Sequence, residues 1–295
     1  MFGTLKWRLK EAADVFLGRK KTQPIKPATQ FQQLEAGKLE PYQINDPELK
    51  ACISSLDIEF CFSEFGENRV NAGGAEFSEK NRLEPSLSSL RKYFPNARYK
   101  VYSDFDLEIP GITLNKVISS PVPDKEHPRY YYRAADYYKF KSLLESDADI
   151  VCVVDSDMFV FSEEIYSLIY LTQVFGFCAP YNPRNLLKRD MQISLDTGEI
   201  NDQSKGYGHS YNQSPMTLHK NNEAAAVYFS KCCEIMVKEP SRASLVMWKA
   251  ARETGLSPYL LPQQWCVCAE DTGIGNEVLL HVGHPSVAEY YNIKL

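Results

Sequence analysis

The chain has 295 residues, of which 44% are hydrophobic and 24% charged, a composition that suits one large α/β domain or two small ones. Its formal net charge of −5 argues against nucleic-acid binding, which normally requires a basic excess. The eight cysteines lie mostly in apolar contexts without Cys-x-x-Cys spacing, so we expect reduced thiols in a cytosolic protein.

The N-terminal segment differs in character from the rest of the chain. Residues 1–21 combine an apolar helical stripe with six basic and two acidic residues. Such a helix can lie on an anionic membrane surface, and packing against the domain explains it equally well. No stretch reaches the roughly 18 apolar residues of a membrane span, and no secretory signal is apparent, so we expect a cytoplasmic protein with a peripheral membrane contact as one option.

Residues 22–47 contain four prolines and several glutamines, which predicts a linker. We therefore predict a helix and linker over residues 1–47 and one folded domain over residues 48–295. From about residue 50, strand-like and helix-like segments alternate, which predicts βα units and a mostly parallel sheet flanked by helices.

The expected elements follow from periodicity and turn residues. Expected strands are 58–63, 98–102, 150–154 and 175–179. Expected helices are 85–93, 129–145, 163–171, 222–238 and 242–253. Residues 188–213 are polar, contain glycine and show no clear period, which favours a loop over a ligand site.

Asp155-Ser156-Asp157 follows the most apolar run of the chain, residues 150–154, and further apolar residues follow at once. The run predicts a strand buried on both faces, and its carboxyl end is the edge where α/β folds bind ligands. Acids at that position oppose burial unless a cation or ligand compensates their charge. Two carboxylates there suit Mg²⁺ or Mn²⁺, which also accepts diphosphate oxygens. An ordinary solvated turn is the alternative.

These features resemble the glycosyltransferase A fold, whose nucleotide-sugar-dependent enzymes carry Asp-x-Asp after a buried strand. The resemblance covers roughly residues 50–285 and is greatest to retaining families, including glycogenin-like and lipopolysaccharide galactosyltransferase-like enzymes. It implies a single Rossmann-like catalytic domain. It also implies Asp155 and Asp157 as ligands of Mn²⁺ or Mg²⁺, with Ser156 among the donor-binding residues.

In those families a basic residue on the preceding helix contacts the donor, about 16 positions before the first Asp, and Lys139 occupies that place. Toxin-like and mannosyltransferase-like relatives carry Asp-x-x-Arg there, which Asp136-x-x-Lys139 resembles with lysine in place of arginine. Arg133 is a further candidate. A solvated helix face is the alternative for all three residues.

The same families place a histidine near the C-terminus as a third metal ligand. The segment Leu280-His281-Val282-Gly283-His284 resembles theirs. His281 is the preferred ligand, and His284 is the alternative because the spacing differs from the family pattern by one residue.

Further donor-site candidates, assigned by resemblance to segments near the transferred sugar, are Asn212, Gln213, Gln263, Gln264 and Trp265. Pro215 replaces a glycine of the first segment, and the second lacks the family's acid, so plain packing competes with sugar binding there. By topology alone, Ser63 and Asp104 stand where such folds hold the base and ribose.

The resemblance implies metal-dependent sugar transfer from a nucleoside diphosphate sugar, with UDP favoured over GDP, to a saccharide or another hydroxyl acceptor. The departing diphosphate develops negative charge, which the cation and Lys139 would neutralise. An inverting enzyme also needs a carboxylate base, for which Asp271 and Glu270 are candidates. A retaining enzyme needs no such base, and the motifs slightly favour retention.

Three other functions compete with this interpretation. A phosphatase with an aspartate nucleophile, as in the haloacid dehalogenase group, fits poorly because Phe159 stands where that group has Thr or Val. A nucleotidyltransferase of similar fold needs a glycine-rich phosphate loop, for which Asn71-Ala72-Gly73-Gly74 is a weak match. A degenerate, non-catalytic sugar-nucleotide-binding protein is disfavoured by the intact Asp155, Asp157 and His281.

Overall fold

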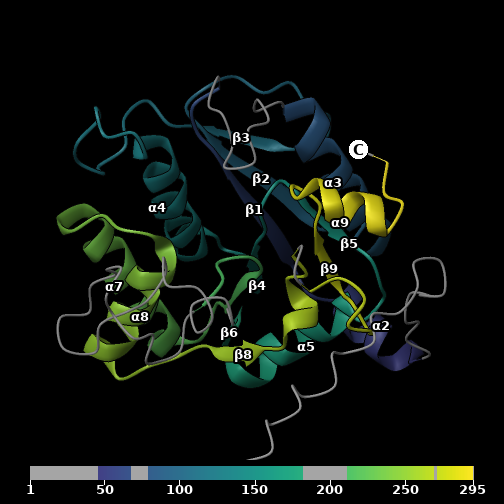
Figure 1. Cartoon of the computed structure of the whole chain (residues 1–295). Coiled ribbons are helices and arrows are strands. Elements are labelled where there is room, and N and C mark those ends of the chain that lie inside the picture. The colour runs from purple at the N-terminus through teal and green to yellow at the C-terminus, as the bar shows by residue number, and fades with distance from the viewer. Residues whose placement is uncertain (1–45, 68–78, 182–210, 269–270, 295) are drawn as a thin grey trace, which may run out of the picture. The chain divides into compact units, whose positions relative to one another are not determined.

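The computed structural model describes residues 46–67, 79–181, 211–268 and 271–294 (Figure 1). The expectations for residues 1–21, for most of the linker, for residues 71–74, for the loop up to residue 210 and for Glu270 lie outside the described residues. Within the described residues, no helix combines the length and the apolar character that crossing a membrane demands.

A seven-stranded sheet forms the centre of the fold, in the order β3-β2-β1-β4-β7-β6-β8. Its strands are β1 (Ile58–Glu64), β2 (Arg98–Ser103), β3 (Thr113–Lys116), β4 (Ile150–Val153), β6 (Phe177–Pro180), β7 (Met216–His219) and β8 (Tyr259–Leu261). Among these described strands, four of the six neighbouring pairs are parallel and the two that involve β7 are antiparallel. The expected mixed α/β domain with a mostly parallel sheet is thus confirmed.

Helices cover both faces of the sheet, as Figure 1 shows. The described helices are α2 (Pro47–Ser54), α3 (Glu79–Tyr93), α4 (Tyr130–Glu145), α5 (Ile165–Phe175), α7 (Glu223–Lys238), α8 (Ala243–Thr254) and α9 (Pro285–Tyr290), with the short 3₁₀ turn η2 (Gln263–Trp265). Phe60 and Phe62 face the core under α2, α3 and α5, while Cys61 faces the core under α4 and α7. This alternation places every residue of β1 and β4 in a buried layer, as the apolar run at 150–154 predicts.

Two helical boundaries illustrate what the sequence pattern captures. α7 begins where predicted, because the Asn222 side chain accepts a hydrogen bond from the backbone N–H of Ala225 (2.8 Å) and caps the helix. α3 begins at Glu79, before the predicted start at Pro85, so this proline lies inside the helix. A proline usually marks a helix start because it lacks a backbone donor, and that rule places the boundary too late here.

A second, two-stranded ribbon lies outside the main sheet. β5 (Met158–Val160) pairs antiparallel with β9 (Leu279–His281), and Met158 lies opposite His281. A small separate core packs α9 against this ribbon and includes Leu280, Val282 and Val287. The sequence pattern does not predict this pairing. It carries the C-terminal histidine segment to the end of the Asp155-Asp157 turn.

Candidate functional site

The candidate site lies where the order of the parallel strands reverses. The chain runs from β1 outward through β2 and β3, and β4 then adds to the opposite side of β1. The carboxyl ends of β1 and β4 therefore border a crevice, the usual ligand position in open α/β sheets. A cavity of about 190 Å³ opens there, lined by Ser63, Glu64, Arg129, Tyr132, Ala135, Asp136, Lys139, Asp155, Ser156, Asp157, Gln213 and His281.

Helix α4 supplies one wall of this cavity. Tyr132, Ala135, Asp136 and Lys139 are spaced i, i+3, i+4 and i+7, so they lie on one face of the helix. Asp136 and Lys139 are each 8% exposed. The alternative of a solvated helix face does not hold for these two residues.

The Asp155-Ser156-Asp157 triplet forms a turn between β4 and β5. The N–H of Val154 still donates to the Cys61 carbonyl of β1 (3.1 Å), whereas the N–H of Asp155 donates to Oγ of Ser214 (2.8 Å). The N–H of Met158 then returns to the Asp155 carbonyl (3.1 Å). The turn interpretation and the ligand interpretation are therefore compatible, because this turn holds both carboxylates at the cavity.

His281 completes a group of three potential metal ligands. Its Nε2 lies 3.1 Å from Oδ2 of Asp157, and one ligand atom from each of Asp155, Asp157 and His281 lies within 4.8 Å of the others. Gly283 permits this approach, since a Cβ at that position would lie 2.0 Å from Oδ2 of Asp157. His284 stacks edge-on against His281, with ring centroids 4.8 Å apart, and is not among the described residues that line the cavity.

Charge interactions set the protonation of these groups. Nζ of Lys139 lies 2.5 Å from Oδ1 of Asp155 and 3.8 Å from Oδ1 of Asp136. Burial lowers the pKa of Lys139, but attraction to the two carboxylates outweighs it and raises the pKa above its ordinary value. Burial raises the pKa of Asp136, against the opposing effects of Lys139 and a hydrogen bond from Gln213. Burial would lower the pKa of His281, whereas Asp157 raises it to about 9.

The donor set fits a hard divalent cation. Four carboxylates line the cavity, together with Arg129, Lys139 and His281. Because the carboxylates outnumber the two permanent cations, an anionic ligand would be repelled unless a further cation entered. The two carboxylates are ligands that Mn²⁺ and Mg²⁺ prefer, and Gly283 leaves room for that of Asp157. The imidazole of His281 is a softer third ligand.

Several predicted donor residues do line this cavity. Ser63 and Gln213 each direct a polar side chain to it, and Ser156 lies between the two acids. Oγ of Ser63 and Oε1 of Gln213 are buried and have no hydrogen-bond partner among the described residues. Unsatisfied buried polar atoms are uncommon in proteins, and at a cavity wall they are available to a ligand.

Other predicted residues lie outside the cavity lining. Oδ1 of Asp104 accepts a hydrogen bond from the N–H of Gly66 (2.9 Å) and so fixes the loop after β1. Arg133 is half-buried on α4 beside the lining face. Nδ2 of Asn212 donates to Sγ of Cys266 (3.0 Å). Buried Asp271 accepts a hydrogen bond from Gln263.

Gln264 and Trp265 line a different hollow of about 470 Å³, together with Glu164, Pro262, Asn276 and Val278. Sequence reasoning missed Glu64, Arg129 and Tyr132, which do line the sheet-edge cavity. Their signals were available: Glu64 directly follows Ser63 at the end of β1, and Tyr132 precedes Lys139 by two helical turns.

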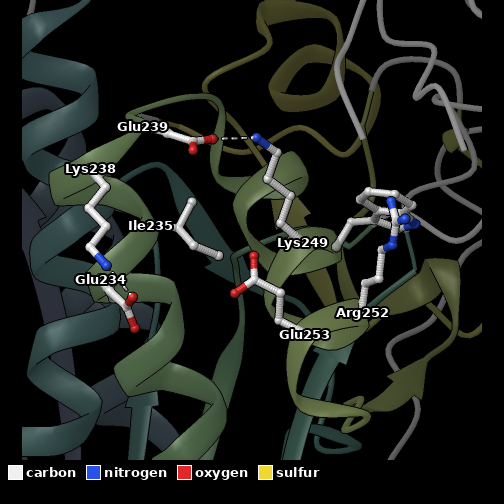
Figure 2. Close-up of a pocket in the computed structure, with 8 residues that line it drawn as sticks. Glu234, Ile235, Lys238, Glu239, Lys249, Arg252 and Glu253 are labelled. Carbon is white, nitrogen blue, oxygen red and sulfur yellow. Dashed lines mark hydrogen bonds and ion pairs between the residues drawn. The ribbon is translucent and has the colours of Figure 1, made fainter. Parts of the chain in front are cut away.

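A third hollow, of about 450 Å³, lies between α7 and α8 and is lined mostly by charged side chains (Figure 2). It is lined by Glu234, Ile235, Lys238, Glu239, Trp248, Lys249, Arg252 and Glu253. Lys238 pairs with Glu234 (2.7 Å) and Lys249 with Glu239 (2.9 Å), and most of these side chains reach solvent. Exposed pairs of this kind contribute little energy and need no ligand, so we interpret the hollow as a solvated surface.

No protein-family model matches this chain, and no curated protein matches its sequence. Among solved structures, the chain is similar to the glycosyltransferase GlyE of Streptococcus pneumoniae TIGR4, with 11% sequence identity and a TM-score of 0.45. The match covers 77% of this chain and 54% of that one, so the chain spans about half the length of this relative.

Proposed function

We propose that this chain is a metal-dependent glycosyltransferase. It would transfer a sugar from a nucleoside diphosphate sugar, with UDP favoured, to a saccharide or another hydroxyl acceptor. The observation that carries the proposal is the convergence of Asp155, Asp157 and His281 beside buried Lys139, at the strand-order reversal of the sheet. This is the arrangement that the family resemblance implies for a diphosphate site.

Asp155, Asp157 and His281 would hold Mn²⁺ or Mg²⁺, which when bound supplies positive charge to the leaving diphosphate. The chain prepares this position in two ways. The hydroxyl of Ser214 fixes the backbone of Asp155, and Gly283 leaves space for the carboxylate of Asp157. Prepositioned ligands need little rearrangement when the cation and donor bind.

Lys139 would act on the leaving group directly. Without ligand, its ammonium group is held by Asp155 and Asp136. If Asp155 ligated a cation, Nζ of Lys139 would be available to a phosphate oxygen, and burial would strengthen that attraction. Arg129 lines the same cavity and offers a second positive group.

The size of the cavity limits what it would bind. About 190 Å³ is below the roughly 300 to 1,000 Å³ of typical ligand pockets, so we assign the cavity to the cation and diphosphate, with base and sugar extending beyond it. Asp271, the candidate base of an inverting reaction, is bonded to Gln263 away from the cavity lining. The slight preference for a retaining outcome, in which assistance to departure suffices, rests on the family resemblance.

A donor screen scored by nucleotide release tests the reaction, and calorimetry with UDP and GDP tests the site. Mn²⁺ should tighten nucleotide binding relative to chelator. Asp157→Asn removes a direct ligand and should weaken the Mn²⁺-dependent binding by at least the roughly 10- to 100-fold that loss of an outer-shell partner costs. Asp106→Asn is the matched control, because that exposed carboxylate pairs with Lys116 away from the cavity. Equal binding with Mn²⁺ and with chelator, or an unaffected Asp157→Asn variant, would contradict the metal assignment.

A further inference from the structure

The two ring nitrogens of His281 face different partners. Nε2 lies 3.1 Å from Oδ2 of Asp157, on the side of the acidic pair. Nδ1 lies 3.5 Å from Sγ of Cys268. Cys266 joins the second side, because one ligand atom from each of Cys266, Cys268 and His281 lies within 4.8 Å of the others. The imidazole therefore stands between an oxygen-rich group and a sulfur-rich group.

The local backbone explains why both thiols face the histidine. Val267 pairs with β9, since its N–H donates to the Leu279 carbonyl (2.9 Å) and its carbonyl accepts from His281 (2.8 Å). In an extended segment, side chains two residues apart point to the same face. Val267 packs in the small core with Leu280, while Cys266 and Cys268 face the main core.

We propose that Cys266, Cys268 and Nδ1 of His281 form a site for a soft divalent cation such as Zn²⁺. Two thiolates and an imidazole are a donor set that zinc prefers, and a fourth position stays open to water or another ligand. Zn–S and Zn–N bonds of about 2.3 and 2.0 Å place tetrahedral ligands roughly 3.5 Å apart. The distance between Sγ of Cys268 and Nδ1 of His281 has this value.

Two contacts around the group point to the same use. A histidine that binds metal through one ring nitrogen commonly donates the other N–H to a carboxylate, and Asp157 stands at that position for Nε2. The amide of Asn212 donates to Sγ of Cys266 at 3.0 Å, a contact that stabilises negative charge on sulfur. The cysteine side of His281 is thus supported by oriented polar groups although both thiols are buried.

The shared imidazole couples the two sides. A neutral His281 that binds Zn²⁺ through Nδ1 carries its proton on Nε2, which then donates to Asp157 and cannot ligate a cation there. Zn²⁺ on the cysteine side would therefore withdraw the third ligand from the Asp155-Asp157 pair and weaken binding of Mn²⁺. This competition rests on the proposed function, whereas the cysteine-side site does not.

Cobalt titration of the full, reduced chain tests the site. Co²⁺ should produce a sulfur-to-metal charge-transfer band that stoichiometric Zn²⁺ removes, and the Cys266→Ser/Cys268→Ser double variant should lose the band. Cys233→Ser, which alters a half-buried thiol on α7, is the matched control and should keep it. Asp155→Asn should also keep the band while losing Mn²⁺-dependent nucleotide binding, which separates this site from the proposed function.

A second measurement needs no variant that must fold. Zn²⁺ should protect Cys266 and Cys268 of the wild-type chain from alkylation, as read by mass spectrometry, and leave exposed Cys52 reactive.

The competition between the two sides has its own test. One equivalent of Zn²⁺ should weaken Mn²⁺ binding at least tenfold in the wild type and not in the Cys266→Ser/Cys268→Ser double variant. No thiolate band in the wild type, or a band that persists in the double variant, overturns the site; unchanged Mn²⁺ affinity overturns the competition.

Discussion

Charged side chains line two hollows among the described residues, the sheet-edge cavity and the hollow between α7 and α8. The charged groups of the two hollows differ in burial. At the sheet edge, Lys139 and Asp136 are each 8% exposed, whereas between α7 and α8 the side chains of Lys238 and Glu239 are 68% and 71% exposed. The exposed hollow is the larger one, yet water already solvates its charges. A charge removed from water requires a partner. Burial of charge, and not the volume of a hollow, therefore locates the candidate site.

The largest expected effect is a difference in the free energy of unfolding between two lysine variants. Lys139→Met leaves Asp136 and Asp155 without their buried cation and should lower the free energy of unfolding by about 3 to 5 kcal/mol. Lys249→Met removes the partner of Glu239, whose side chain is 71% exposed, and should change the free energy of unfolding little. Urea unfolding of both variants without divalent cations makes the comparison.

Acid pH and Mn²⁺ sharpen this result. The loss in Lys139→Met should shrink at acid pH, because Asp136, whose pKa burial already raises, then takes up a proton. Added Mn²⁺ should also restore part of the stability of Lys139→Met. Equal losses in the two lysine variants would mean that burial does not distinguish the hollows.

The next effect is a pH dependence of the metal-free protein. The pKa of His281 is about 9 in the folded chain against 6.5 as its ordinary value, so the stabilisation is complete below pH 6.5 and is lost as pH rises through 9. The loss should reach about 3 kcal/mol at most. Chemical unfolding between pH 6 and 9.5 measures it. His281→Gln should flatten this alkaline limb, and His219→Gln, at the far end of β7, should preserve it.

A smaller effect is expected from the glycine beside Asp157. Gly283→Ala places a Cβ 2.0 Å from Oδ2 of Asp157 unless the turn shifts, so Mn²⁺ affinity should fall about tenfold. Gly255→Ala has open space but a positive φ of 70°, so it should lower stability without changing Mn²⁺ affinity. Calorimetric Mn²⁺ titration of both variants separates a local effect on the ligands from general destabilisation. Equal Mn²⁺ affinities would contradict the role of Gly283.

The smallest effect is predicted on the exposed side. Hydrogen bonds from Lys231 and Lys238 lower the pKa of Glu234 to about 2, so its stabilisation is present above pH 4.5 and is lost as pH falls towards 2. Glu234→Gln should leave the urea midpoint at pH 7 nearly unchanged and slightly reduce the loss of stability in acid. High salt should remove even this difference, because exposed pairs are screened. A large change at pH 7 would contradict the interpretation of this hollow as a solvated surface.

Local patterns predicted the part of the site that is local in sequence. The apolar run before Asp155 identified β4, whereas Lys139 was assigned through the family resemblance, and the structure places it on the face of α4 that lines the cavity. His281 was reached through family resemblance, since nothing in its own neighbourhood predicts that β9 pairs with β5. Cys266 and Cys268 lack Cys-x-x-Cys spacing, and they lie beside His281 only because Val267 pairs with β9, so no local pattern predicts this group of ligands.

Packing also explains why some residues assigned to the donor site lie outside the sheet-edge cavity. Gln264 and Trp265 lie on a short turn whose backbone bonds to residue 278, and this bond directs them to a separate hollow. No local pattern predicts the hydrogen bond between Ser214 and Asp155, because it depends on the antiparallel placement of β7 beside β4. Strands of three or four residues, such as β7 and β8, have too few positions for a period to be recognised.

Because β7 runs antiparallel to β4, the residues just before β7, and not those after it, border Asp155. A parallel strand beside β4 would have its C-terminal end at the edge where Asp155 lies, whereas β7 has its N-terminal end there. Gln213 and Ser214, which immediately precede β7, therefore border the acids from the approach side of the strand. Substitution of Gln213 alters the surroundings of Asp155 while the buried register of β4 and β7 stays fixed. The ligand preference of the cavity can thus change there independently of the stability of the sheet.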